Sequence, residues 1–167
     1  MDESPAQAGW RRWVEDHAPK LLLFARQQAR CEADAQDLVQ EAVMEAAQRN
    51  GTEMPPPVAL VFATIHRRAI DLARREDRRT GREQSATEPL PVSWFDDSAE
   101  DREMKQLLEG AISRLPEMYA RVITLKIWGG LTFAQIGEVL DIPANTAASR
   151  YRYGLVELRK LMKRVLT

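Results

Sequence analysis

Polar and basic side chains recur on one face of a helix predicted near the carboxyl terminus, at a spacing suited to DNA contacts. In chain order, the residues of this face are Asn145, Ala148, Ser149, Arg152 and Tyr153. Residues three and four apart lie on the same side of a helix. Their amide, hydroxyl and guanidinium groups can form hydrogen bonds with base edges in the major groove. We expect them to reach bases if the first half of this helix enters the groove.

The remaining basic residues of this segment are suited to phosphates rather than bases. From Ala144 onward, six basic residues accompany a single acid, Glu157. Those expected to contact phosphates are Arg150, Arg159, Lys160, Lys163 and Arg164. Phosphate contacts set the orientation of the protein and make its affinity sensitive to salt, but they carry no base sequence directly.

Residues 131–160 have the pattern of a helix-turn-helix that would position this face. Thr132 and Gln135 form a capping box at the start of a first helix, which turns Ile136 inward. Pro143 is suited to the first turn of the second helix, because a proline cannot sit in a helix interior. The second helix has an apolar seam made of Ala147, Tyr151, Gly154, Leu158 and Leu161. A simple helical hairpin with a solvated arginine face is the alternative.

Two other predicted helices differ sharply in charge. The helix over residues 58–79 displays Arg67, Arg68, Arg74, Arg75, Arg78 and Arg79. The helix over residues 34–48, capped by Asp34 and ended by Asn50 and Gly51, has an acidic and amide-bearing outer face. Duplex DNA would repel that face, so the chain suggests one surface for DNA and another for a protein.

Helical periodicity dominates the chain and no strand alternation is present, so we expect an all-α fold. It would comprise two small helical domains, residues 1–79 and 102–167, joined by a flexible linker over residues 80–101. Pro19 is expected to separate two short helices near the amino terminus. Trp94 and Phe95 stand out in the polar linker, and we expect them to dock onto a domain or a partner.

Composition narrows the class of protein. The chain has 167 residues, 44% of them hydrophobic, and a net charge of −1, which argues against coating nucleic acid by bulk charge. A single cysteine, Cys31, excludes an internal disulfide and is typical of a reducing compartment. No apolar run approaches the roughly 20 residues of a membrane span, and the start lacks a signal-peptide pattern. We expect a cytoplasmic protein with no membrane insertion.

An enzyme is the least favoured class. Asp37 and Glu41 share a helix face, and Glu41 and Glu45 repeat the spacing. The two histidines and the cysteine are scattered, and none lies close enough in sequence to complete a metal site or a nucleophile pair. We therefore expect no enzymatic activity, no metal and no cofactor.

Three stretches resemble the extracytoplasmic-function (ECF) sigma factors of bacterial RNA polymerase. The likeness to their carboxy-terminal promoter-binding domain lies in LPEMYARVITLKIWGGLTFAQIGEVLDIPANTAASRYRYGLVELRKLM. The likeness to their amino-terminal domain lies in DAQDLVQEAVMEAAQ and FATIHRRAIDLARRE. The resemblance implies a dissociable subunit that binds core RNA polymerase, through its beta-prime and beta subunits, and directs promoter recognition and DNA melting in transcription initiation.

The resemblance also implies a role for each surface. The acidic helix would dock on a coiled coil of the beta-prime subunit through Asp37, Gln40 and Glu41. At the minus-10 element, Arg49, Asn50 and Thr52 would line a pocket for an unstacked base, and Arg67, Arg68, Arg74 and Arg75 would bind the backbone. The minus-35 element would be contacted by Asn145, Ser149, Arg150, Arg152 and Tyr153. For each carboxylate, an ordinary solvated helix face is the alternative.

The chain departs from the family at three places. A tryptophan usual in the basic helix is Leu60, an asparagine common near Arg67 is replaced, and Ala148 stands where a basic residue is frequent. Promoter selection is therefore expected to depend on this chain's own reading face. In the linker, Asp96, Asp97, Glu100 and Asp101 would suit a segment that mimics nucleic acid inside the polymerase, and a solvated tether is the alternative.

A free-standing helix-turn-helix regulator, with an amino-terminal helical sensor or dimerisation domain, is the second hypothesis. It predicts tight binding to a symmetric site as a dimer without polymerase. The arginine-rich helix over residues 58–79 disfavours it, because a sensor domain needs no basic groove. The sequence leaves open whether an anti-sigma factor controls the chain.

Overall fold

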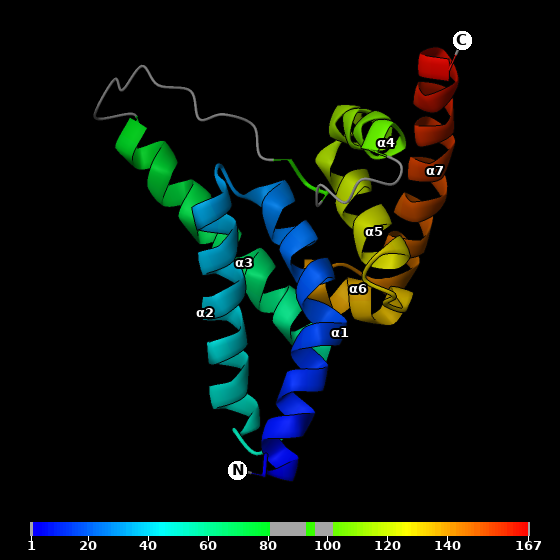
Figure 1. Cartoon of the computed structure of the whole chain (residues 1–167). Helices are drawn as coiled ribbons and strands as arrows, with labels where there is room; N and C mark the ends of the chain where they lie inside the picture. The colour runs from blue at the N-terminus through cyan, green and yellow to red at the C-terminus, as the bar shows by residue number, and fades with distance from the viewer. Residues whose placement is uncertain (1, 81–92, 96–101, 167) are drawn as a thin grey trace. The chain divides into compact units, whose positions relative to one another are not determined.

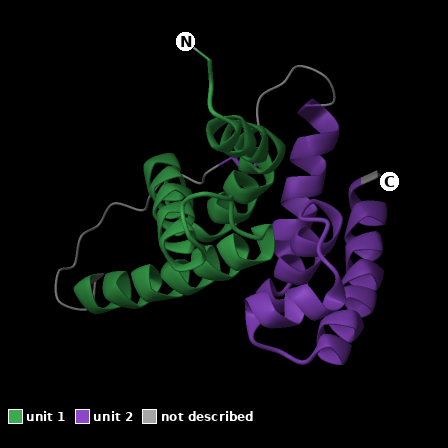
Figure 2. Ribbon diagram, turned by 90° about the horizontal axis from the view of Figure 1, so that it is seen from below, with its two compact units in different colours: residues 1–92 green, residues 93–167 purple. Residues whose placement is uncertain are grey.

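The computed structural model describes residues 2–80, 93–95 and 102–166, and all regular structure in this part of the chain is helical. The chain divides into two compact units, Met1–Val92 and Ser93–Thr167 (Figure 2). The predicted all-α class with two small domains is therefore confirmed. None of the helices described is long and apolar enough to cross a membrane.

Unit 1 contains three helices that pack on one another around a single core (Figure 1). They are α1 (Pro5–Gln28), α2 (Glu32–Asn50) and α3 (Val58–Thr80). Phe24 of α1 and Phe62 of α3 are fully buried, and their rings meet edge to face with centroids 5.4 Å apart. The buried face of α2 contains Ala35, Ala42 and Ala46, whose small side chains let it approach the other two helices closely.

The predicted break at Pro19 is wrong, because Pro19 lies inside the continuous helix α1. A proline within a helix removes the hydrogen bond to the carbonyl four residues earlier. Pro19 is exposed, so water can satisfy the carbonyl of Glu15. The residues that follow, including Leu21 and Phe24, are buried and hold the second half of α1 to the core. Core packing thus outweighs the local preference for a break.

The start of α2 also differs from the prediction. Its N-cap is Cys31, and Asp34 lies in the first turn, where a carboxylate complements the helix dipole. Arg26 at the end of α1 donates two hydrogen bonds to the carboxylate of Glu32, at 2.9 and 2.7 Å. This bidentate pair holds Glu32 at the first position of α2, so the helix begins earlier than the capping pattern indicated.

Unit 2 contains four helices: α4 (Arg102–Arg114), α5 (Glu117–Ile127), α6 (Phe133–Leu140) and α7 (Ala144–Leu166). The long helix α7 packs against the other three. A Cβ at Gly154 would lie 3.0 Å from both the Tyr119 Cβ and the Ile123 Cδ1, so the glycine permits α7 to approach α5 closely. The predicted seam of α7 is confirmed, since Ala147, Gly154 and Leu158 are buried.

The docking predicted for Trp94 and Phe95 is confirmed. Trp94 packs on the core of unit 2, and its backbone N–H donates to the Glu109 Oε1 at 3.1 Å. The ring of Phe95 lies 5.6 Å from that of Trp128. Residues 93–95 therefore belong to unit 2, whereas the predicted linker extended to residue 101. The linker acids proposed to mimic nucleic acid, Asp96, Asp97, Glu100 and Asp101, lie outside the described residues.

Thr124 in α5 offers a test of the core of unit 2. It is 2% exposed, and its Oγ1 has no hydrogen-bond partner among the described residues. A buried hydroxyl without a partner costs about 1–3 kcal/mol. We expect Thr124→Val to raise the free energy of unfolding by about 1 kcal/mol and Tm by a few degrees, measured by calorimetry. A lower Tm would show that the hydroxyl contributes a stabilising hydrogen bond.

Candidate nucleic-acid interface and acidic helix

The first helix of the predicted helix-turn-helix begins as the sequence indicated. The Thr132 Oγ1 accepts a hydrogen bond from the Gln135 backbone N–H at 3.1 Å, and the Gln135 side chain accepts one from the Thr132 N–H at 2.9 Å. This capping box satisfies two backbone donors at the start of α6. Inside the unit, Ile136 is fully buried. The start of α6 is therefore defined by local hydrogen bonds and by packing together.

The turn between α6 and α7 is held by backbone contacts. Asp141 ends α6 in the left-handed conformation, with φ 57°, and the Ile142 N–H donates to the Gly137 carbonyl at 2.9 Å. A Cβ at Gly137 would lie 2.6 Å from the Ile142 carbonyl oxygen, so only a glycine allows this close return. Pro143 then precedes α7, which begins at Ala144. These contacts determine the angle at which α7 leaves the turn.

The side chains predicted for the minus-35 element lie on the first half of α7. Asn145, Arg152 and Tyr153 are exposed, and Ser149 and Arg150 are partly exposed. The Arg152 guanidinium lies over the ring of Tyr153, 5.6 Å from its centroid. Across the described residues, no ion pair engages Arg150 or Arg152. The positive charge of this face is therefore available to an anionic ligand.

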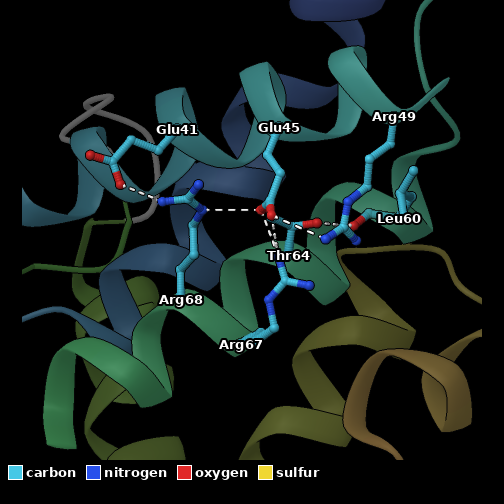
Figure 3. A network of polar contacts seen from close by, with 7 residues as sticks. All are labelled: Glu41, Glu45, Arg49, Leu60, Thr64, Arg67 and Arg68. Carbon is cyan, nitrogen blue, oxygen red and sulfur yellow. Dashed lines mark hydrogen bonds and ion pairs between the residues drawn. The ribbon is translucent and has the colours of Figure 1, made fainter. Parts of the chain in front are cut away.

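The basic side chains of α3 divide into two groups. Arg74 and Arg75 are exposed and form no ion pair within the described ranges. Arg67 and Arg68 instead turn toward α2 (Figure 3). The sequence predicts one DNA-binding surface made of these four arginines, but only Arg74 and Arg75 are exposed without an acidic partner in the described part of the chain.

The carboxylate of Glu45 on α2 forms ion pairs with three arginines (Figure 3). The Arg67 Nη2 lies 2.6 Å from both carboxylate oxygens of Glu45, and the Arg68 Nε donates to the Glu45 Oε2 at 3.2 Å. The Arg49 Nη2 lies 3.3 Å from the Glu45 Oε1. Arg68 also donates from Nη1 to the Glu41 Oε2 at 2.9 Å. Residues predicted for polymerase and for DNA thus share one ion-pair network.

Burial and charge act in opposite directions on Glu45. Burial raises the pKa of its carboxyl group, but the hydrogen bond from Arg68 and the charges of Arg67, Arg68 and Arg49 lower it more, so the net pKa is below its ordinary value. Sequence reasoning did not assign Glu45 to a site. Its spacing of four residues from Arg49 predicts one of its ion pairs, but no local pattern predicts those with α3.

The lowered pKa of Glu45 gives a prediction about acid. A carboxylate whose pKa is depressed by folding stabilises the fold above its unfolded pKa, and that contribution is lost as pH falls through the folded pKa. We expect the Tm of the wild-type chain to drop below about pH 4.5, the ordinary value, more steeply than that of Glu45→Gln. Thermal melts between pH 7 and 3 would measure this, and parallel curves for the two proteins would contradict it.

The loop between α2 and α3 forms an open hollow lined by residues 50–57, among them Asn50 and Thr52. Gly51 turns the chain here with φ 93°. Trp10 of α1 donates from its Nε1 to the Thr52 carbonyl at 2.9 Å and so ties the loop to unit 1. Arg49 lies on the last turn of α2 and does not line the hollow. The structure therefore brings two of the three predicted pocket residues together.

The outer face of α2 carries the residues predicted to bind polymerase. Asp37, Gln40 and Glu41 are all exposed, and Asp37 makes no ion pair in the described part of the chain. Met44, four residues after Gln40, is 56% exposed and adds an apolar contact to the same face. Sequence reasoning missed Met44, although its helical spacing indicated it. Acid, amide and thioether groups side by side suit a protein partner better than DNA.

Each of the two units matches a known protein family. Residues 13–79 match the family Sigma-70 region 2, and residues 105–158 match the family Sigma-70, region 4. The ECF RNA polymerase sigma factor SigE of Mycolicibacterium smegmatis is 26% identical over 94% of this chain and 63% of its own length. The RNA polymerase sigma-E factor of Streptomyces coelicolor is 27% identical over 90% of this chain and 84% of its own.

A solved structure has the same fold. The sigma factor RpoE of Bartonella quintana, in complex with the anti-sigma factor NepR, superposes with a TM-score of 0.72 over 92% of this chain and 96% of that chain, at 19% identity. The alignment spans less than two thirds of the length of the SigE relative. With both sigma regions matched in order along one all-helical chain, the protein belongs to the ECF family of sigma factors.

Proposed function

We propose that this chain binds core RNA polymerase and directs it to promoters with two recognition boxes. Unit 2 contacts the minus-35 box by placing the first half of α7 in the major groove, with Asn145, Ser149, Arg150, Arg152 and Tyr153 toward the DNA. Unit 1 recognises and opens the minus-10 box. The chain contributes binding energy and no catalytic groups, so it is an initiation subunit rather than an enzyme, and it acts with the polymerase in the cytoplasm.

One observation carries the proposal: an exposed reading face on a helix-turn-helix coexists in one chain with an exposed acidic face on a separate unit. Arg152 and Tyr153 on α7 are free to meet DNA. Asp37 and Glu41 on α2 would be repelled by it and are suited to basic groups of a protein. With Gln40, these two residues are the proposed contact with the beta-prime subunit of core polymerase, which also engages the chain through its beta subunit.

The minus-10 assignment rests on the loop and α3. Asn50 and Thr52 line a hollow that can receive an unstacked base, and their amide and hydroxyl groups can form hydrogen bonds with its edge. Arg74 and Arg75 are exposed and suited to the phosphates of the displaced strand. Binding energy of this kind would melt the duplex without ATP. Arg49, Arg67 and Arg68 are assigned to the same surface, although each of them also forms an ion pair with Glu45 of α2.

A protein that silences the chain is part of the proposal. The RpoE structure that shares this fold contains the anti-sigma factor NepR. We extend to this chain the idea that an anti-sigma factor controls it. A partner that covers either the reading face of α7 or the acidic face of α2 would block transcription.

Reconstituted transcription tests the proposal. Purified chain and bacterial core RNA polymerase are mixed with a pool of genomic promoter fragments, and the transcripts are sequenced. We expect the chain to co-elute with core on gel filtration and to produce new transcripts whose start sites follow a shared two-box sequence. The proposal fails if no complex and no new transcript form. Tight binding of a dimer to a palindromic duplex without polymerase would instead support a free-standing regulator.

A further inference from the structure

The ion-pair network between α2 and α3 occupies groups that the proposed function assigns to DNA. The guanidinium groups of Arg67 and Arg68 already have anionic partners in the folded chain, at 2.6 Å for Arg67 with Glu45 and 2.9 Å for Arg68 with Glu41. A carboxylate takes the place on a guanidinium group that a phosphate oxygen would take. A DNA phosphate must therefore displace a carboxylate before it can bind either arginine fully.

The exposed fractions of the two glutamate side chains indicate which of them holds the arginines more strongly. The Glu45 side chain is 21% exposed, compared with 57% for Glu41, and the arginine side chains are 46% (Arg67) and 35% (Arg68) exposed. Charges that are partly withdrawn from water interact more strongly than pairs in open solvent. Glu45 is the most sheltered member and touches both arginines, so it is the centre of the network.

We propose that Glu45 is a positioning residue that holds the guanidinium groups of Arg67 and Arg68 against α2 and so weakens their binding to DNA in the free protein. Arg74 and Arg75, further along α3, have no acidic partner in the described ranges and remain available. The free chain therefore presents only part of its basic surface. The inference deepens the proposed function, and it rests on that function for the identity of the DNA site and of the polymerase.

The network also joins the two proposed binding surfaces. Glu41 is assigned to polymerase, and its Oε2 accepts a hydrogen bond from Arg68, which is assigned to DNA (Figure 3). A basic polymerase group that draws Glu41 away leaves Arg68 with one anionic partner instead of two. Polymerase binding therefore favours the release of Arg68 to DNA. Since linkage is reciprocal, DNA bound at Arg68 strengthens polymerase binding at Glu41 by the same factor.

The affinity of the free chain for a labelled single-stranded oligonucleotide, measured by fluorescence anisotropy over a range of salt, tests the inference. Glu45→Gln removes the charge and keeps the size of the side chain. We expect it to bind the oligonucleotide about three- to tenfold more tightly at low salt. The slope of log K, the association constant, against log salt should become steeper by the amount that about one to two additional phosphate contacts produce. For Glu41→Gln, which frees one donor of Arg68, we expect a gain of about twofold.

Asp71→Asn is the matched control, because Asp71 is an exposed acid on α3 that forms no ion pair in the described part of the chain. It makes the same change in net charge, and we expect a gain below twofold with an unchanged salt slope. An equal gain in Asp71→Asn would overturn the inference, since general charge would then explain the effect. Unchanged or weaker DNA binding by a folded Glu45→Gln protein would also overturn it. If Glu45→Gln does not fold, Glu41→Gln provides the test, and unchanged DNA affinity in that variant would overturn the inference.

The inference and the proposed function fail separately. A chain that initiates transcription with core polymerase but shows no gain in Glu45→Gln retains the proposed function and loses the positioning role. A chain that gains DNA affinity in Glu45→Gln but never binds core polymerase keeps the role of Glu45 and loses the proposed function. A direct check on the link is the holoenzyme, in which the gain of Glu41→Gln over wild type is expected to shrink, because polymerase already draws Glu41 away from Arg68.

Discussion

Asp37→Lys is expected to weaken binding of the chain to core RNA polymerase by roughly tenfold or more while leaving its helix content and Tm nearly unchanged. Asp37 is exposed and has no ion pair among the described residues, so the fold loses no contact when it is replaced. Placing like charges against each other at an interface costs several kcal/mol, and each 1.4 kcal/mol is about tenfold in affinity. Titration of labelled chain with core polymerase, followed by anisotropy, measures the change.

Two further variants sharpen that result. Glu15→Lys makes the same charge reversal at an exposed position of α1, outside the proposed contact, and should bind core polymerase as wild type does. Arg152→Ala should also bind core normally but lose promoter selection, since a base contact by arginine contributes about 1–3 kcal/mol. If Asp37→Lys instead impairs promoter selection and Arg152→Ala impairs core binding, the two surfaces have been assigned in the wrong order.

Gly137→Ala is expected to lower the stability of unit 2 by about 1–3 kcal/mol and to abolish most minus-35-dependent transcription. The added Cβ would lie 2.6 Å from the Ile142 carbonyl oxygen and 3.4 Å from the Ala144 backbone nitrogen. Both are backbone atoms and cannot rotate away, so the turn must shift and α7 must change its angle. Calorimetry measures the stability, and transcription from promoters with and without a minus-35 box measures the function.

Gly110→Ala is the matched control for that substitution. Gly110 lies within α4, and a Cβ there would meet nothing within 4 Å. Alanine favours the helix over glycine, so we expect a gain of about 0.5–1 kcal/mol and unchanged transcription. Equal stability of the Gly137→Ala and Gly110→Ala proteins would contradict the close approach of α6 to the turn that follows it.

The features of this protein that depend on residues close together in the sequence were predictable without the structure. The capping box of Thr132 and Gln135, the turn before Pro143 and the exposed positions on α7 follow from spacing within a few residues. The same holds for Asp37, Gln40 and Glu41, which share a helix face because they are three and four residues apart. The all-α class and the residues on each helix face can therefore be predicted from the sequence alone.

Tertiary structure alone decided which charged groups meet and how the loop is held. Glu45 and Arg67 are 22 residues apart in sequence, and Trp10 and Thr52 are 42 apart, so no periodic pattern links them. The continuity of α1 through Pro19 likewise depends on the burial of Leu21 and Phe24 against the other two helices. A sequence pattern reports the environment of one helix at a time. The pairing of arginines with α2 arises only when the packing of three helices brings separate faces into contact.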